Sequence, residues 1–500
     1  INKMTFKSAL LAGTLALASL PALAQTEAVG SARLFQPDYF SQFSPSTALD
    51  MVRRIPGFSI QEDNDGSRGL GQAEGNVLIN GRRVSGKSLT LSDALARIPA
   101  TNVEKIELVD GATLDIPGLS GQVANVTAKV NGMSGTWDWR ARFRENLPPF
   151  YHGGNISVTG RQDTLAWTLG VNSNPIRGAA RGPEYVYDAN RDRIETREED
   201  VNNVGDEAGI SGSLEWTPAN GSVANFNAEY NIFQIDTREI SDRFPEDGSP
   251  PRFRRFSNSE DEWNSEVGGD YEFGLGPGRL KTIALWRFEH SPFMSSVRTI
   301  EADGTLSEQS IFEQTVDEGE SILRSEYSWK PSEGRDWQIA AEGAFNFLDA
   351  EAAFQSLDGN GVLVPVPLDN ANSRVEEKRA EVNITHGRKL SDKLSIQASL
   401  GAEYSELSQS GGATQTREFT RPKGFVSAAY VVNEKLTINA KIAREVGQLN
   451  FFDFISSVNI NAGNGNQGNP DIVPQQSWES EIEFEKDYGS AGAHTLKFYY

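Results

Sequence analysis

Cysteine is absent from this 500-residue chain, and histidine occurs only four times. Without cysteine the protein cannot use disulfides to stabilise small modules, so its stability must come from sheet pairing or from large cores. Structural zinc and iron–sulfur sites depend on cysteine and histidine ligands. The sequence therefore predicts no protein-bound metal and no other cofactor.

Positive charge is also scarce, because 47 lysine and arginine residues stand against 69 aspartate and glutamate residues, giving a formal net charge of −22. A charge of this sign repels the phosphates of nucleic acid, which excludes nucleic acid as a partner. Catalytic signatures are missing as well, since the chain has neither a nucleophile elbow nor an H-E-x-x-H sequence. We therefore do not expect an enzyme or any catalytic residue.

Long apolar runs are missing with one exception near the N-terminus. Residues 8–24 form a short apolar stretch that follows Lys3 and Lys7 and ends in Ala-Leu-Ala. These features are typical of a secretory signal peptide, so we expect residues 1–24 to be removed by cleavage between Ala24 and Gln25. The alternative, an uncleaved anchor helix, would need about 20 apolar residues.

The chain does contain a persistent alternation of apolar and polar residues between Gly209 and Tyr500. Residues 222–233 show it best, with Ala224, Phe226, Ala228, Tyr230 and Ile232 on one parity and Asn225, Asn227, Glu229 and Asn231 on the other. Side chains on a strand alternate between faces, so each such stretch predicts a strand with one apolar and one polar face.

The connections between these predicted strands alternate between short and long. Short turns are expected near 160–163, 217–222, 275–279, 330–336, 389–393, 432–435 and 488–493, and long polar loops over 173–207, 237–262, 290–320, 348–377, 405–421 and 447–477. Outer-membrane barrels have this asymmetry, with short periplasmic turns and long extracellular loops. The pattern predicts a mainly β protein with a transmembrane antiparallel β-barrel over 135–500; a water-soluble barrel or sandwich is the alternative.

The number of predicted strands is odd. One strand over 136–146 and two strands beside each of the seven short turns give about fifteen, whereas single-chain barrels normally have an even number. The chain also ends inside an alternating stretch at Tyr500. We therefore expect the barrel to be incomplete in this sequence.

The polar strand faces are expected to line the barrel lumen. Glu479, Glu481, Glu483 and Glu485 share one face of a predicted strand, and four carboxylates facing lipid would be costly. A lumen with several such faces is either a water-filled pore or a cavity that holds a polar domain.

Residues 44–130 read as a compact α/β unit that could fill that lumen. The sequence predicts a helix over 46–52, a strand over 77–79 with a hairpin turn at Asn80-Gly81, a helix over 89–98 and a strand over 103–109. Residues 25–43 then form an N-terminal extension. This organisation gives two domains after the signal peptide.

Several of these segments resemble the plug domain of TonB-dependent outer-membrane receptors. The matching stretches are the helix that ends in Pro56-Gly57, an Arg-Gly pair at 68–69, a Val-Leu-Ile-x-Gly turn at 77–81, and Ile98-Pro99 followed by Val-Glu-x-Ile-Glu at 103–107. Downstream, residues 468–479 resemble the barrel signature N-P-x-L-x-P-E-x-S. The usual glycine-rich end of the plug is altered at 121–126, where one glycine is lost, and the sequence has no clear TonB box.

The resemblance implies energy-coupled uptake through the cell outer membrane of a Gram-negative bacterium. Complete members of the family have a 22-stranded barrel sealed by the plug, and their partners are the inner-membrane TonB complex and outer-membrane lipid. The implied substrate is a scarce nutrient, a ferric siderophore or similar metal chelate first, with an oligosaccharide or cobalamin as alternatives. The barrel is expected to be monomeric.

The resemblance also implies where function resides. Arg68, Gln72, Arg82 and Arg83 would lie at the plug apex and meet the ligand, because guanidinium groups bind carboxylates well. The alternative is that these arginines pair with carboxylates of the lumen. Thr26, Glu27, Ala28 and Val29 are the candidate TonB-coupling segment.

Two other classes of function remain open from the sequence. A passive channel or binding barrel without TonB coupling would need no folded N-terminal domain of this size. An outer-membrane enzyme would need an active-site signature, and the sequence contains none that we recognise. The mixed charges of the loops, such as Arg252, Arg254 and Arg255 beside Glu260, Asp261 and Glu262, select no ligand class.

Overall fold

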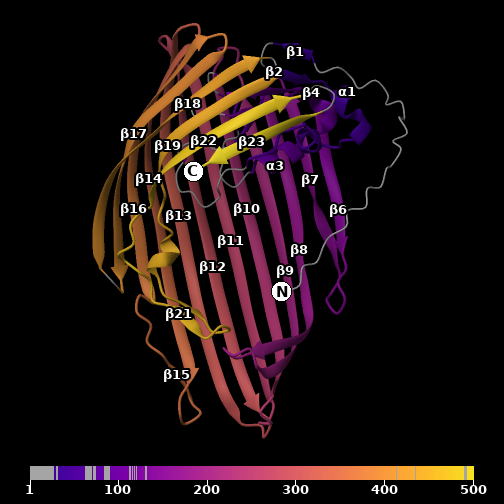
Figure 1. Ribbon diagram of the computed structural model, residues 1–500, viewed down its shortest axis with the longest axis vertical. Helices are drawn as coiled ribbons and strands as arrows, with labels where there is room; N and C mark the ends of the chain where they lie inside the picture. Colours follow the sequence, from indigo (N-terminus) through magenta and orange to yellow (C-terminus); the bar gives the residue numbers. More distant parts are fainter. Residues whose placement is uncertain are drawn as a thin grey trace, which may run out of the picture.

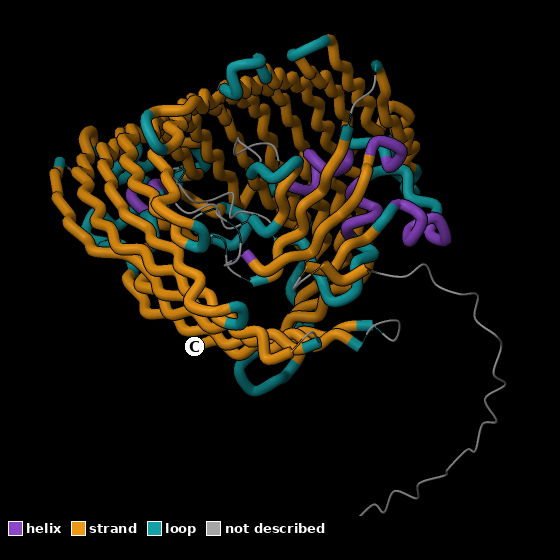
Figure 2. The backbone as a smooth tube through the Cα atoms, turned by 90° about the horizontal axis from the view of Figure 1, so that it is seen from above, coloured by secondary structure: helices purple, strands orange, loops and turns teal. Residues whose placement is uncertain are grey.

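A computed structural model gives the arrangement of the chain (Figure 1). It describes residues 27–29, 32–61, 70, 75–83, 90–111, 114, 116, 119, 121–129, 132–412, 414–433, 435–488 and 492–500. Two bodies are present: a large antiparallel sheet, and a smaller α/β domain on its concave side (Figure 2). The chain is mainly β, as predicted.

Fifteen strands follow one another along the path of the large sheet, with each strand hydrogen-bonded to its neighbours. They are β6 (Met133–Arg142), β7 (Phe150–Gln162), β8 (Leu165–Tyr187), β9 (Arg193–Trp216), β10 (Val223–Pro245), β11 (Arg252–Leu275), β12 (Gly278–Glu301), β13 (Leu306–Ser332), β14 (Arg335–Leu357), β16 (Asn372–Ser391), β17 (Leu394–Gly411), β18 (Gln415–Asn433), β19 (Leu436–Val446), β22 (Gln476–Asp487) and β23 (Ala493–Tyr499). A short strand, β15 (Leu363–Pro365), pairs with β14 off this path. The sheet curves without closing, and β6 and β23 form its two edges.

The seven short connections between strands lie where the alternation predicted them, although residues 434 and 489–491 of two of these turns lie outside the described residues. The predicted long loops are mostly wrong. Residues 173–207, for example, are strand up to Tyr187 and again from Arg193, so that the true connection is a tight turn. The strand halves far from the short turns pair through their backbones, but their outward face is no longer uniformly apolar, which is why an apolar period of two did not reveal them.

The outward face of the sheet carries an apolar band on the half next to the short turns. Its exposed members, taken from nine of the strands, include Leu169, Ile210, Tyr230, Val267, Leu323, Val382, Leu400, Val426 and Ile442. A band of this kind is the lipid-facing surface of an outer-membrane barrel. The strand halves far from the short turns therefore project beyond the band, toward the bottom of Figure 1.

The α/β domain is built around a five-stranded sheet with the order β1-β2-β4-β5-β3, in which only the β3–β5 pair is parallel. Its elements are β1 (Glu27–Val29), β2 (Ala32–Phe35), α1 (Pro37–Phe40), η1 (Ser41–Phe43), α2 (Ala48–Val52), β3 (Val77–Ile79), α3 (Leu91–Ala96), η2 (Ala100–Asn102), β4 (Val103–Asp110) and β5 (Gln122–Ala128). Both predicted helices and both predicted strands are present. The turn at Asn80-Gly81 also forms, but β3 pairs mainly with β5 rather than in a hairpin.

Local sequence explains where the helices of this domain begin. The Thr47 side chain accepts a hydrogen bond from the Asp50 N–H, and the Asp50 carboxylate accepts one from the Thr47 N–H at 3.0 Å. Such a capping box satisfies two N–H groups that the first helical turn leaves without partners. Thr90 caps α3 through its side chain alone, which accepts a hydrogen bond from the Asp93 N–H at 3.0 Å.

The core of the α/β domain reaches further toward the N-terminus than the predicted 44–130 unit. Phe35 and Phe40 are almost fully buried and pack with Met51, Leu95 and Ile106. β2 is paired with β4, so residues 32–43 belong to the same fold as the rest of the domain.

Within the described part of the chain, no helix is long and apolar enough to cross a membrane.

Candidate functional site

A row of five charged residues crosses the inner face of the sheet, and we call it the charged row. Arg324, Glu342, Glu381, Glu403 and Arg421 stand directly opposite one another on β13, β14, β16, β17 and β18. Their side chains are no more than 5% exposed. The buried carboxylates of Glu342, Glu381 and Glu403 are therefore neighbours across three adjacent strands.

Four cations compensate these carboxylates. Arg379 Nη2 lies 2.5 Å from Glu342 Oε1, and Arg421 Nη2 lies 2.7 Å from Glu403 Oε1. Lys423 pairs with Glu381, and Arg324 lies 3.3 Å from Glu342. Like charges placed directly across a sheet repel one another, so the row is stable only while these cations remain in place.

The α/β domain touches the charged row directly. The N–H of Leu70 donates to Glu342 Oε2 at 3.2 Å. Other polar contacts fix the domain against the wall: Gln122 donates to Glu485 at 2.8 Å, and Arg33 lies 3.8 Å from Asp487. Glu483, which is buried beside Gly121, and Glu485 face the domain, so their predicted lumen position is confirmed.

Arg82 lies close to the short-turn end of the wall, where its guanidinium is 3.9 Å from Glu215. Glu215 precedes Trp216, the last residue of β9, and also pairs with Arg161. This position matches the alternative reading, in which the arginine pairs with a lumen carboxylate. Arg83 is half-buried.

Several predicted site residues lie outside the described residues: Ala24, Gln25, Thr26, Arg68 and Gln72. The backbone of Glu27, Ala28 and Val29 forms β1, which pairs with β2 at the edge of the five-stranded sheet of the α/β domain. Their assignment as a coupling segment and the assignment of Arg68, Gln72, Arg82 and Arg83 as ligand contacts stay predictions.

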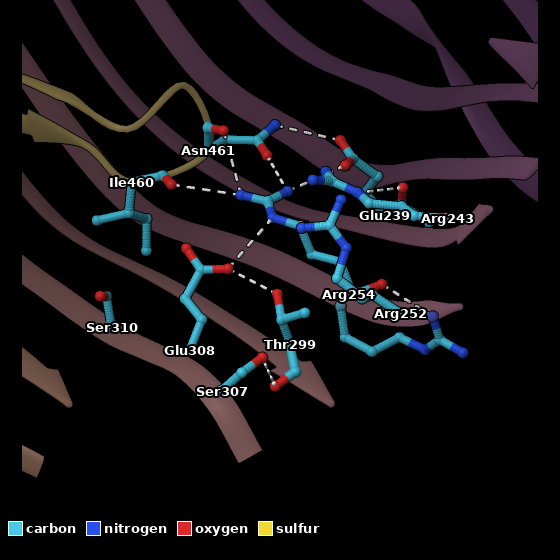
Figure 3. Close-up of polar contacts among 12 residues, drawn as sticks. Glu239, Arg243, Arg252, Arg254, Thr299, Ser307, Glu308, Ser310, Ile460 and Asn461 are labelled. Carbon is cyan, nitrogen blue, oxygen red and sulfur yellow. Dashed lines mark hydrogen bonds and ion pairs between the residues drawn. The ribbon is translucent and has the colours of Figure 1, made fainter. Parts of the chain in front are cut away.

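A second polar cluster lies around Arg254, at the end of the wall far from the short turns (Figure 3). Arg254 is 4% exposed, and its Nη1 is 2.5 Å from Asn461 Oδ1 and 3.3 Å from Glu239 Oε1. Its Nη2 donates to the backbone oxygens of Ile460 and Asn461. Asn461 also donates to Glu239 at 3.1 Å, so each of the three side chains of Arg254, Asn461 and Glu239 is hydrogen-bonded to the other two.

Asn461 belongs to residues 447–475, which join β19 to β22 and which we call the strap. The strap contains η4 (Phe451–Phe454) and a small hairpin of β20 (Ser457–Asn459) and β21 (Asn464–Asn466). It folds inward against the wall. Phe454 and Ile455 are buried with residues of four strands, namely Val316, Leu348, Val375 and Leu407.

Polar contacts also hold the strap from several strands. Gln314 donates to the Ser456 oxygen at 3.0 Å, and Gln409 donates to the Phe454 oxygen at 3.0 Å. Arg417 donates to the oxygens of Pro470 and Ile472 at 2.6 and 2.7 Å. The strap was predicted only as a long polar loop; its aromatic residues at 451–454 were the signal of burial that could have been noticed.

The described residues contain no group of three or more histidine, aspartate or glutamate side chains that could hold a metal ion. The chemistry of both clusters is ion pairing and hydrogen bonding. Such groups can position a domain or bind a polar solute.

An α/β domain seated inside a curved wall with an outward apolar band is the arrangement of a plugged β-barrel, here with the wall open between β6 and β23. Residues 24–122 match the family model described as TonB-dependent Receptor Plug Domain. The chain has the plug-and-barrel organisation of the TonB-dependent receptors, which are transport receptors of the outer membrane. The α/β domain is therefore called the plug below.

Solved structures that match the chain include the siderophore receptor PiuA from Acinetobacter baumannii, with 12% identity, a TM-score of 0.43, and coverage of 96% of this chain and 73% of that chain. Copper transporter OprC has 11% identity, a TM-score of 0.44, and coverage of 96% and 76%. The hemophore receptor HasR from Serratia marcescens has 10% identity, a TM-score of 0.45, and coverage of 94% and 72%. No curated protein sequence matches the chain.

Proposed function

We propose that this protein is an outer-membrane receptor that imports a scarce small-molecule nutrient and is driven by the inner-membrane TonB complex. The observation that carries this proposal is the polar seat of the plug, in which Leu70 contacts Glu342, Gln122 contacts Glu485 and Arg33 contacts Asp487. Polar interfaces between domains can exchange their partners for water, so the plug can move without exposing a large apolar surface. Gated import requires such movement, because the plug otherwise obstructs the lumen.

The proposal includes the route by which energy reaches the plug. β1 lies at the edge of the plug sheet, where its pairing to β2 is the only one among the described strands. An edge strand offers free backbone groups to an added strand, and a pull on residues 26–29 would pass through β2 to the centre of the plug sheet. Cleavage after Ala24 would leave this segment near the new N-terminus.

The first substrate class that we propose is a ferric siderophore or similar chelate. Four arginines lie close together on the inner face of the wall, at the end far from the short turns: Arg197, Arg243, Arg252 and Arg254. Each has carboxylate or hydroxyl neighbours there. Guanidinium groups bind the oxygen donors of such chelates through charge-assisted hydrogen bonds. A carbohydrate or cobalamin is the alternative class of substrate.

A passive channel is the competing function. The plug core, its contacts with the wall and the inward strap all obstruct the lumen that a passive channel would keep open. We therefore favour the gated receptor, inserted as a monomer in outer-membrane lipid.

The test is uptake of radiolabelled ferric chelates by cells that lack their own ferric receptors and express the full chain. We expect uptake that stops when TonB is deleted, and that falls at least tenfold in Ala28→Pro, because proline removes a backbone donor from β1. Ala28→Ser is the matched control and should retain uptake. Uptake that persists without TonB would favour the passive channel, and a lack of chelate uptake with TonB-dependent sugar uptake would change the substrate class.

A further inference from the structure

A polar cavity of about 390 Å³ lies between helix α3 of the plug and the inner wall of β6 to β12. From the plug, Thr90, Asp93 and Arg97 line it. Arg97 reaches the wall at Gly170, where an added Cβ would lie 3.7 Å from the guanidinium carbon. Burial lowers the pKa of Arg97, and the nearby carboxylates of Glu229 and Asp93 act in the opposite direction.

The wall of this cavity carries a row of amide side chains, which we call the amide row. Asn155, Asn172, Gly209, Asn231 and Asn264 stand directly opposite one another on β7, β8, β9, β10 and β11. The four asparagines all line the cavity. Five adjacent strands thus present four amides and one glycine at the same level.

Gly209 provides the space that the row needs. A Cβ at this position would lie 2.5 Å from Asn172 Oδ1 and closer still to Asn231 Oδ1. The amides of the two flanking strands therefore converge over the bare backbone of β9. A side chain here would push them apart, and because they are the ends of flexible side chains the wall itself would stay folded.

The two halves of the row differ in their hydrogen bonding. Asn231 Nδ2 donates to Glu229 at 2.7 Å and to Asn264 Oδ1 at 3.1 Å, which fixes those two amides. Among the described residues, Asn155 and Asn172 have no side-chain hydrogen bond. Their donors and acceptors face the cavity and are available to a solute.

The charges that line the cavity cancel. Asp93, Glu207 and Glu229 are balanced by Arg97, Arg140 and Arg287. A balanced site gives no net attraction to an anion or a cation, whereas each amide can both donate to and accept from a hydroxyl or amide group.

We infer that the amide row is a binding site for a neutral solute rich in hydroxyl or amide groups, held between the plug and the wall. This inference rests on the proposed import function and names the chemistry of what passes the plug. The same chemistry is found in neutral oligosaccharides and in neutral hydroxamate chelates of iron.

The test is equilibrium dialysis of the purified full chain in detergent against three radiolabelled probes: maltotriose, the neutral hydroxamate chelate ferrichrome, and anionic ferric citrate. At least one neutral probe should bind. Gly209→Ala should weaken that binding about tenfold, as expected when about 1.4 kcal/mol of hydrogen bonding is lost. Asn172→Ala is a second variant that should weaken it in the same direction.

Gly212→Ala is the matched control, because it lies on the same strand and its added Cβ would make ordinary contacts with Leu169 at 3.4 Å. It should leave the affinity unchanged. The neutral probe whose binding is weakened by Gly209→Ala shows whether the site takes an oligosaccharide or a hydroxamate chelate. The inference is overturned if no neutral probe binds, if only ferric citrate binds, or if Gly209→Ala and Asn172→Ala bind as wild type does. Dialysis measures binding and needs no energy source. Uptake in cells that continues after TonB is deleted would therefore refute the proposed function, while the binding measured by dialysis would still stand.

Discussion

At the scale of single residues, the inner wall is defined by which charges are neighbours. Glu342, Glu381 and Glu403 are brought together by strand register alone, and their mutual repulsion has to be offset by Arg324, Arg379, Arg421 and Lys423. Buried pairs of this kind add little net stability over apolar residues, but removing one partner leaves an uncompensated charge. The charged row is therefore sensitive to single substitutions.

Glu403→Gln is expected to destabilise the wall by about 3–5 kcal/mol, because Arg421 and Lys423 lose the carboxylate that they share. The measurement is the urea midpoint of unfolding in detergent micelles. Glu406→Gln on the same strand is the control: its pair with Lys378 is exposed, so its removal should change the midpoint little. Equal midpoints for the two variants would show that the row contributes nothing to stability.

Sequence reasoning recovered part of this residue-scale picture. Parity placed Glu483 and Glu485 in the lumen, because a strand has only two faces and one of them meets lipid. It could not predict that Arg254 would meet Asn461, since the two are 207 residues apart and only tertiary structure joins them. The glycine of the amide row was equally hidden, because its role depends on asparagines from two other strands.

At the scale of elements, the strap is the segment whose structure differs most from its predicted loop. Its aromatic residues are divided between a buried and an exposed position: Phe454 is 1% exposed and Phe452 is 44% exposed. Both belong to η4, so they differ in packing and share the same local backbone. This difference provides a matched pair of substitutions.

Phe454→Ala should release the strap from the wall, because removing a buried phenylalanine typically costs about 3–5 kcal/mol. We expect limited proteolysis within residues 447–475 to accelerate at least tenfold on intact cells or in detergent. Phe452→Ala should leave the rate near that of wild type. If both variants are cleaved as slowly as wild type, then the polar contacts of Arg254, Gln314, Gln409 and Arg417 suffice to hold the strap.

The strands themselves show how far sequence pattern reaches. Their membrane halves were predicted because lipid imposes apolar residues on one face, and each short turn was located from the break in alternation. Beyond the apolar band, lipid no longer sets the pattern. Most residues of β8 between Gly178 and Tyr187 are exposed on both faces, so alternation carries no signal there. Backbone pairing continues nonetheless, because every strand has a neighbour to satisfy its N–H and C=O groups.

At the scale of the whole molecule, the plug and the wall are separate folds that meet through polar side chains. The plug has its own core around Phe40, Leu95 and Ile106, and the wall is held by its strand ladder. Gln122 and Glu485 meet at 2.8 Å across the two folds. Relative motion therefore requires loss of contacts between folds and no unfolding of either one.

A reversible cross-link between the plug and the wall should stop import if the plug has to move. The chain has no cysteine, so Gln122→Cys combined with Glu485→Cys supplies a unique pair for a short bis-methanethiosulfonate. We expect uptake in cells to fall at least tenfold after cross-linking and to return after reduction. The single-cysteine variants, treated identically, should transport normally. Undiminished uptake through the cross-linked protein would mean that substrate passes without displacement of this part of the plug.

The height of the wall has a consequence for the cell surface. Strands β8 to β14 have 23 to 27 residues each, whereas about 9–11 residues cross the hydrocarbon of a membrane. More than half of each strand would thus stand in the surrounding water as a rigid collar. Antibodies or phages approaching from outside would meet the tight tips at 188–192 and 302–305 before any part of the polar interior.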